Sequence, residues 1–108
     1  MSDFHDGQRV LAQWDGGGFW FPGRVHSIGG DGAVAVRYDD GMSDIRPPNQ
    51  VKSFDWEIGS RIEALWSGNG RWYAARILDM DEDGRNVLVR FEDDGIREAR
   101  ATGQCRSA

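Results

Sequence analysis

Hydrophobic and polar residues alternate along most of the chain in short runs, and glycine-rich segments separate these runs. The first half contains "QRVLAQW", "FWFPGRVHSI" and "AVAVRYD", and "DGGG", "GGDG" and "DG" stand between or after them. Alternation with a period of two, rich in β-branched and aromatic residues, is typical of antiparallel strands that bury one face. No window has a helical period, so the pattern predicts an all-β protein.

The pattern occurs twice. At a spacing of 52 positions, glycine, arginine, alanine, tryptophan and aspartate recur together, so that "AQWDGGGFW" corresponds to "ALWSGNGRW". The spacing becomes 53 at Val36 and Val89, and 54 where Asp39, Asp40 and Gly41 are matched with Asp93, Asp94 and Gly95. Such a repeat defines the folding unit within which each single motif lies. The slips predict loops that gained a residue.

The repeat predicts two small barrels, residues 1–52 and 53–108, each built from four or five strands. Phe4 and Trp56 precede the repeats, and we expect each to pack on its own barrel. Only "PPNQVKSFD" connects the two. Because domains of this size have little core, we expect the barrels to touch.

Strand parity indicates where the aromatic residues point. Val10, Ala12 and Trp14 share one face of the first strand, and the corresponding faces of the next two strands end in aromatic residues as well. If the aliphatic positions fill the barrel, the aromatic residues meet at one rim beside an aspartate. The groups are Trp14, Phe21, Tyr38 and Asp40 in the first repeat, and Trp66, Tyr73, Phe91 and Asp94 in the second.

Two interpretations of these groups stay open. Aromatic faces beside a carboxylate form a cage for a methylated ammonium group, which is attracted to the rings and to the negative charge. Alternatively, the rings only close the end of a small core, where tyrosine and tryptophan are commonly half exposed.

The charge of the chain indicates the charge of its binding partner. The chain has 108 residues and a net charge of -5, and acidic residues outnumber basic ones in both halves. Such a surface repels phosphate backbones and attracts basic peptides. The single cysteine, Cys105, and the lack of a long apolar run favour an intracellular protein, nuclear in a eukaryote or cytoplasmic in a bacterium.

The segments "AQWDGGGFWFPGRV…VAVRYDDG" and "EALWSGNGRWYAARI…VLVRFEDDG" resemble Tudor domains, in the broader group that includes Agenet domains. The resemblance extends from about Gly7 to Val51 and from Gly59 to Arg100. It implies SH3-like barrels, and an aromatic cage for methylated lysine or arginine at the two groups named above. We expect the second cage to be the working one, since Phe21 replaces a tyrosine in the first.

Trp20 and Trp72 have the opposite parity to the core residues, so we expect them at an interface. The interface partner is the other barrel, a second copy of the chain, or a bound peptide. Twelve of the thirteen basic residues are arginine. Arg24 with Arg37, and Arg76 with Arg90, form outward stripes that could meet nucleic acid. Ion pairs with Glu63, Asp44, Glu92 and Glu98 are the favoured interpretation.

Catalytic and metal sites are not indicated. His5 and His26 lack a nucleophile or further ligands at useful spacing, and "DMDEDG" lacks the length and terminal glutamate of a calcium loop. We therefore expect a non-enzymatic module without cofactor or metal, which binds a cationic protein segment, methylated or not. The alternatives are a nucleic-acid-binding accessory domain and a self-associating scaffold.

Overall fold

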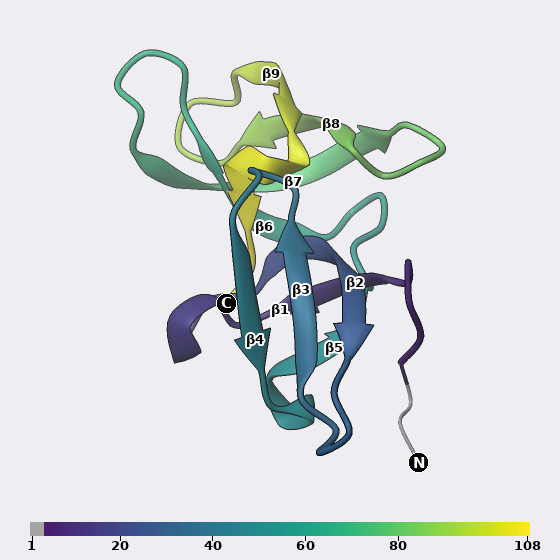
Figure 1. Cartoon of the computed structure of the whole chain (residues 1–108). Helices are drawn as coiled ribbons and strands as arrows, with labels where there is room; N and C mark the ends of the chain where they lie inside the picture. Colours follow the sequence, from purple (N-terminus) through teal and green to yellow (C-terminus); the bar gives the residue numbers. More distant parts are fainter. Residues whose placement is uncertain (1–3) are drawn as a thin grey trace. The chain divides into compact units, whose positions relative to one another are not determined.

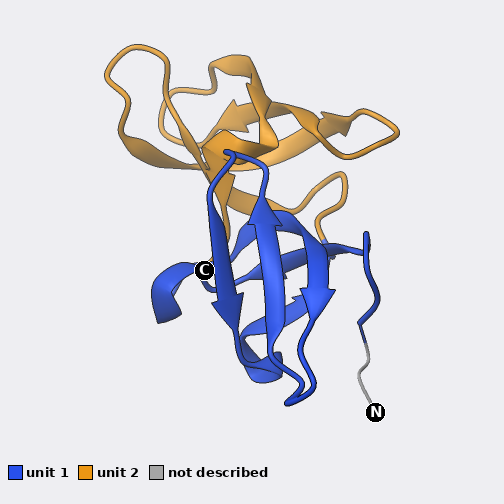
Figure 2. Cartoon of the chain, in the orientation of Figure 1, with its two compact units in different colours: residues 1–55 blue, residues 56–108 orange. Residues whose placement is uncertain are grey.

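The computed structural model describes residues 4–108 of the chain. Within this part there are ten strands and three short 3-10 helices of three residues each, and no longer helix. The chain divides into two compact units, Met1–Asp55 and Trp56–Ala108 (Figures 1 and 2). The predicted all-β fold of two small antiparallel units is confirmed.

The first unit is a five-stranded antiparallel sheet in the order β4-β3-β2-β1-β5. Its strands are β1 (Arg9–Ala12), β2 (Phe21–Ile28), β3 (Val34–Tyr38), β4 (Ser43–Arg46) and β5 (Val51–Ser53), with 3-10 helices η1 (Trp14–Gly16) and η2 (Pro48–Gln50). Short turns connect β2 to β3 and β3 to β4, as the glycine pattern predicts, whereas residues 13–20, which include η1, connect β1 to β2.

The second unit repeats this arrangement in the order β10-β6-β7-β8-β9. Its strands are β6 (Arg61–Leu65), β7 (Trp72–Met80), β8 (Asn86–Phe91), β9 (Arg97–Ala101) and β10 (Cys105–Arg106), with the 3-10 helix η3 (Thr102–Gln104) before the last. Both β2 and β7 carry an irregularity in register at matching places, between Val25 and Ser27 and between Ile77 and Asp79.

Strand parity identifies most of the core, but Leu11 and Pro22, which have the opposite parity, are fully buried as well. The first unit buries Val10, Ala12, Val25, Val34, Val36, Tyr38 and Val51, and Phe4, Phe21 and Ile28 pack against this cluster. The second buries Trp56, Ile62, Ala64, Ala75, Ile77, Val87, Val89, Phe91 and Cys105. Valine dominates the first core, and isoleucine and valine together supply four residues of the second, because a β-branched side chain suits a pleated strand with one buried face.

The sequence had suggested that the segment between the repeats is only a connection, but part of it forms a strand. Val51–Ser53 forms β5, which pairs with β1 so that Val10 lies opposite Ser53 and Ala12 opposite Val51. In the second unit, β10 pairs with β6 at the corresponding edge, with Cys105 opposite Ala64. The 3-10 helices η2 and η3 come directly before β5 and β10 and turn the chain back toward the first strand of their own unit.

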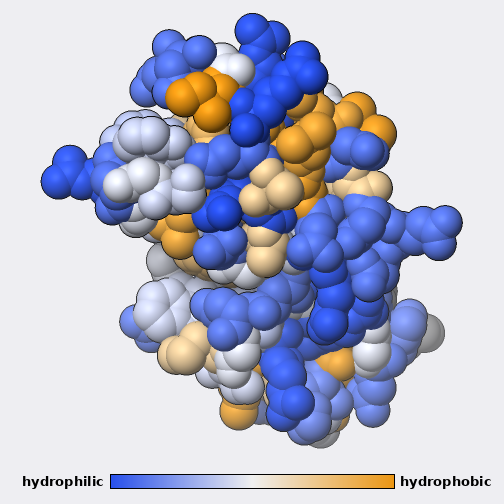
Figure 3. Space-filling model, turned by 90° about the horizontal axis from the view of Figure 1, so that it is seen from above, coloured by the Kyte–Doolittle hydropathy of each residue, from blue (hydrophilic) through white to orange (hydrophobic). Residues whose placement is uncertain are grey.

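The described surface is mostly polar. The face shown in Figure 3 carries mainly hydrophilic side chains with separate hydrophobic patches. The large hydrophobic side chains that are exposed are Trp14, Met42, Ile45, Ile58 and Ile96. In residues 4–108, no helix is long and apolar enough to cross a membrane.

Candidate functional site

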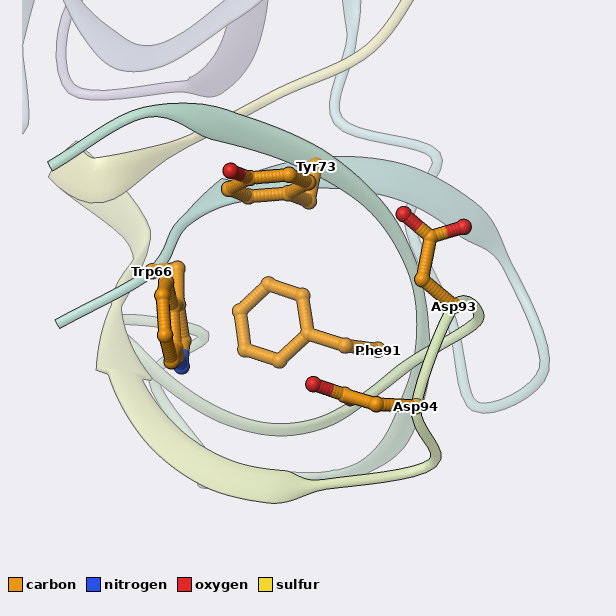
Figure 4. Close-up of a pocket in the computed structure, with 5 residues that line it drawn as sticks. All are labelled: Trp66, Tyr73, Phe91, Asp93 and Asp94. Carbon is orange, nitrogen blue, oxygen red and sulfur yellow. The ribbon is translucent and has the colours of Figure 1, made fainter. Parts of the chain in front are cut away.

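A pocket in the second unit contains the residues that the sequence assigned to its cage. Trp66, Tyr73, Phe91, Asp93 and Asp94 line a volume of about 140 Å³. Trp66 follows β6, Tyr73 lies in β7, Phe91 ends β8, and the two aspartates are in the turn between β8 and β9. Phe91 forms the base of the pocket, and the other four side chains surround it (Figure 4).

The three rings stand close to perpendicular to one another. The ring centroids of Trp66 and Tyr73 are 6.2 Å apart with an angle of 88° between the planes, and those of Tyr73 and Phe91 are 6.5 Å apart at 89°. In Figure 4 the rings of Trp66 and Tyr73 are seen edge-on while that of Phe91 faces the viewer. The arrangement resembles the corner of a box, with a different ring on each inner face.

The turn between β6 and β7 holds two of these rings in place. A Cβ atom on Gly68 would come within 2.6 Å of the Trp66 ring, so only glycine allows the indole to pack against this backbone. The side-chain amide of Asn69 donates a hydrogen bond of 2.8 Å to the hydroxyl of Tyr73. Both rings are therefore held by contacts within this turn, which lowers the entropy cost of binding.

The two aspartates give the pocket its charge. The Asp94 carboxylate accepts a hydrogen bond of 3.0 Å from the backbone N–H of Ile96, which fixes its orientation. Asp93 is exposed, and its side chain has no hydrogen bond or ion pair with any described residue. The carboxylates occupy the sides of the pocket that the aromatic rings leave open (Figure 4).

The corresponding residues of the first unit also lie near one another, with clear differences. The Trp14 and Phe21 rings are 6.4 Å apart at 79°, and Trp14 is 44% exposed. Tyr38 is buried, and its hydroxyl has no hydrogen-bond partner. Asp40 accepts a hydrogen bond of 2.9 Å from the N–H of Met42, as Asp94 does from Ile96.

The first unit lacks the supports found in the second. Gly16 matches Gly68 in the repeat. A Cβ atom on Gly16 would lie 3.1 Å from the Arg46 guanidinium and not against the tryptophan ring. Phe21 has no hydroxyl with which to accept a hydrogen bond. We therefore retain the expectation that the second cage is the working one, and it stays a prediction.

Trp20 and Trp72, the predicted interface residues, are half-buried under cations of their own units. The Lys52 ammonium lies 4.7 Å from the Trp20 ring centroid, and the Arg106 guanidinium lies 4.2 Å from that of Trp72. Arg106 also pairs with Glu63 at 2.8 Å. These contacts cover apolar ring surface, since cation and ring attract each other. The interface of Trp20 and Trp72 stays a prediction.

The acidic residues that the sequence singled out form ion pairs, but of the stripe arginines only Arg76 takes part among the described residues. Glu63, Asp44, Glu92 and Glu98, the four acidic residues expected to pair with arginines, do so with Arg106, Arg46, Arg61 and Arg100 respectively, and Glu92 contacts Arg76 as well. The arginines of the proposed stripes do lie opposite each other, since Arg24 faces Arg37 and Arg76 faces Arg90.

Sequence reasoning missed Asp93 as a pocket residue and matched it with Asp39. The structure corrects this match. The backbone N–H of Asp39 donates to Pro22 just as that of Glu92 donates to Ala74, so Asp39 corresponds to Glu92. The change of spacing from 53 to 54 was the available signal, because it marks one extra residue in this turn.

Comparisons with known proteins give two kinds of similarity. No protein-family model matches the chain. The survival of motor neuron-related-splicing factor 30 of Xenopus tropicalis is 36% identical over 39 residues. These residues are 36% of this chain and 16% of that protein, so the chain matches a small part of the relative's length.

Solved structures resemble the chain over almost its full length. The Crb2 tandem tudor domains match with a TM-score of 0.63 and 17% identity, over 100% of this chain and 82% of that one. AGDP1 AGD34 of Arabidopsis thaliana matches with a TM-score of 0.47 and 18% identity, over 97% of this chain and 82% of that one. At such low identity the likeness to the Crb2 domains concerns the fold.

Proposed function

The chain has the tandem Tudor fold. We propose that it is a non-enzymatic binding module whose second unit binds a methylated, positively charged side chain of another protein. The observation that carries this proposal is the pocket formed by Trp66, Tyr73 and Phe91, whose ring faces stand at right angles beside two carboxylates. The proposal requires no cofactor.

A methylated ammonium group suits three ring faces better than an unmodified one does. Aromatic faces carry negative potential and attract a cation, and a desolvated contact of this kind contributes about 2 kcal/mol. An unmodified ammonium is strongly hydrated and loses this water when it enters an apolar pocket. Methyl groups spread the charge and gain contact with the rings, so methylation lowers the cost of entry.

The carboxylates add long-range attraction. Asp93 and Asp94 lie at the exposed side of the pocket, where an incoming cation meets them first. The net charge of -5 acts in the same direction and favours a basic segment as the carrier of the methylated residue. Phe91 at the base of the pocket is only 3% exposed, so the half-buried Trp66 and Tyr73 supply most of the accessible ring surface.

The two alternative functions receive less support. The net charge of -5 opposes binding to phosphates, and Arg76 of the arginine stripes is engaged by Glu92. The rings of Trp20 and Trp72 are partly covered by Lys52 and Arg106, which reduces the apolar surface available for self-association. Nucleic-acid binding and self-assembly remain predictions from the sequence.

Titration with short peptides tests the proposal. The peptides carry one lysine or one arginine, unmodified or methylated, in an otherwise identical glycine–serine sequence. Binding of a methylated peptide should be lost in Trp66→Ala, because one wall of the cage is removed. The matched variant Trp14→Ala should leave the affinity within about twofold. Calorimetry or NMR titration gives the dissociation constants.

Two results would contradict the proposal. One is the absence of binding by every methylated peptide at millimolar concentration. The other is binding that Trp66→Ala leaves unchanged, which would place the ligand elsewhere. Circular dichroism of both variants checks that the sheets are intact.

A further inference from the structure

We infer that the free edge of β9 in the second unit pairs with the same edge of a second copy of the chain, so that two chains associate as an antiparallel dimer. This interface is separate from the faces of Trp20 and Trp72 considered above. None of the pocket residues belongs to β9, so the inference is independent of the proposed function.

β9 is the last strand of its sheet, and within the described chain it pairs with β8 alone. The backbones of Ile96 and Thr102, which flank β9, form hydrogen bonds with the chain at the two ends of β8. Along an antiparallel strand, the residues that bond to one neighbour alternate with those that face the other side. Arg97, Ala99 and Ala101 therefore direct their backbone N–H and C=O groups to the free edge.

These backbone groups are open to another strand. Arg97, Ala99 and Ala101 are exposed, and their N–H groups donate to no residue in the range 4–108. The C=O of Ala99 accepts a hydrogen bond of 2.8 Å from the side chain of Arg100 and can accept a second one. A row of unpaired N–H and C=O groups is a template for a further strand, and the two alanines allow close approach.

The corresponding edge of the first unit is protected. Its strand β4 is followed by Pro47, which takes the place of Ala101 in the repeat and has no N–H. The N–H of Ile45, which matches Ala99, donates to the carboxylate of Asp44 at 2.8 Å. Proline and charged side chains commonly keep an edge strand from pairing with another chain. β9 has neither of these devices, so the second unit offers the edge that a further strand can extend.

The residues of β9 favour a second copy of the same strand as the occupant. When Ala99 pairs with Ala99 of the second copy, Glu98 stands opposite Arg100 of that copy, and Arg97 stands opposite its Ala101. Opposite charges across a strand pair stabilise it, whereas like charges destabilise it. The next hydrogen-bonded registers place Glu98 opposite Glu98, or Arg100 opposite Arg100. The charges therefore select one symmetric register, in which the whole of β9 is paired.

A groove beside β9 suits Arg97 of the second copy. It has a volume of about 240 Å³, and apolar and acidic side chains line it, among them Met80, Leu88, Asp79 and Asp81. In the symmetric register, Arg97 of the second copy lies opposite Ala101, which pairs with Asn86 at the edge of this groove. Arginine rests its apolar stem on such a surface and directs its charge to nearby carboxylates. Arg97 has no ion pair with a described residue of its own chain, so it is available for this contact.

Ala101→Pro copies the protection of the first unit and tests the interface. Ala101 has a φ of -67° and Pro47 one of -64°, so proline fits at this position without strain. The N–H that is lost faces the free edge, so the pairing of β9 with β8 is kept. Each dimer loses two hydrogen bonds by symmetry, and we expect its dissociation constant to rise about tenfold or more.

Sedimentation equilibrium of the full chain measures the association, from about 10 μM to about 1 mM because so small an interface is weak. The mass of wild type should rise from that of one chain toward that of two.

Substitutions at Ala99 test the register. Ala99→Arg and Ala99→Glu each place like charges opposite each other at the symmetry axis, so each variant alone should stay monomeric. An equimolar mixture of the two should form a mixed dimer, since opposite charges then face each other. Ile45→Arg is the matched control in the first unit and should dimerise like wild type. Circular dichroism checks that the sheets of every variant are intact.

Three results would overturn the inference. The first is a wild-type chain that stays monomeric at about 1 mM, even where a partner peptide occupies the edge of β9. The second is a dimer that Ala101→Pro leaves unchanged or that Ile45→Arg abolishes, since the chains then associate through another surface. The third is a mixture of Ala99→Arg and Ala99→Glu that does not associate. The peptide titrations with Trp66→Ala are separate from all three, so the proposed function stands or fails on its own.

Discussion

At the scale of single residues, the two units exchange a tyrosine and a phenylalanine. The first has Phe21 and Tyr38 where the second has Tyr73 and Phe91. The Tyr73 hydroxyl accepts a hydrogen bond from Asn69, whereas the Tyr38 hydroxyl is buried without a partner. Burial, together with nearby Asp44, raises the pKa of Tyr38 above its usual range, so the hydroxyl keeps its proton. The exchange gives the second pocket a tyrosine that is held by a hydrogen bond, and it leaves the first unit with an unsatisfied buried hydroxyl that lowers its stability.

Tyr38→Phe should therefore stabilise the first unit by about 1 kcal/mol, because an unsatisfied buried hydroxyl is removed and the ring stays. Tyr73→Phe is the matched control, and it should destabilise the second unit by about 0.5–1 kcal/mol through loss of the Asn69 hydrogen bond. Urea unfolding followed by amide NMR signals of each unit measures both effects. A clear loss of stability in Tyr38→Phe would contradict the assignment of its hydroxyl as unsatisfied.

Sequence alone predicts the rings but not their support. Parity placed Trp66, Tyr73 and Phe91 on one rim because alternation fixes the face of each strand residue. The packing of Trp66 on Gly68 and the Asn69 bond to Tyr73 depend on the path of a turn, which alternation does not describe. Whether a carboxylate such as Asp39 is free or paired likewise depends on which arginine lies beside it in the folded sheet.

At the scale of elements, the turns distinguish one unit from the other. The strands repeat closely, while the second unit has one residue more between the paired residues Met80 and Val87 than the first has between Ile28 and Val34, and one more between β8 and β9 than between β3 and β4. The first of these longer turns is organised by Asp81. Its carboxylate accepts hydrogen bonds from the backbone of Arg85 and from both the backbone and side chain of Asn86. The acidic segment "DMDEDG" thus ends in a hairpin turn, as predicted.

These hydrogen bonds give the turn a pH dependence. The side-chain bond from Asn86, followed by its backbone bond, lowers the pKa of Asp81 from 3.8 to about 2. A carboxylate with a lowered pKa in the folded state stabilises that state above its unfolded pKa. This contribution should fall away as the pH drops from about 4 to about 2. Asn86→Ala should move the pKa of Asp81 back toward 3.8, as followed by carboxyl NMR.

Asn69→Ala provides the control, since its amide bonds to Tyr73 and not to a carboxylate. It should leave the Asp81 titration unchanged. An unchanged pKa of Asp81 in Asn86→Ala would show that another group causes the shift.

The short strands at the sheet edges are the elements that the sequence did not reveal. β5 and β10 have three and two residues, too few for alternation to be recognised. Each follows a 3-10 helix in which the chain reverses, and each gains its stability from pairing with a strand far away in the sequence. The long central strands, β2 and β7, were evident because their alternation extends over eight and nine residues.

At the scale of the whole molecule, duplication has produced two units of one fold with different rims. The second has supported rings, a measurable pocket and an added acidic residue, whereas the first has a more exposed tryptophan and a carboxylate bound to Arg9. The net charge of -5 attracts a basic segment without selecting for methylation. On this account, charge brings the partner to the surface and the pocket of the second unit recognises its methylated residue.

The most direct test is the observation of NMR contacts between a bound ligand and the pocket. In a complex with a dimethyl-lysine peptide, the N-methyl protons should show nuclear Overhauser effects to the ring protons of Trp66, Tyr73 and Phe91. They should show none to Trp14 or Phe21. Contacts to the first unit, or saturable binding without any contact to these three rings, would contradict the central claim.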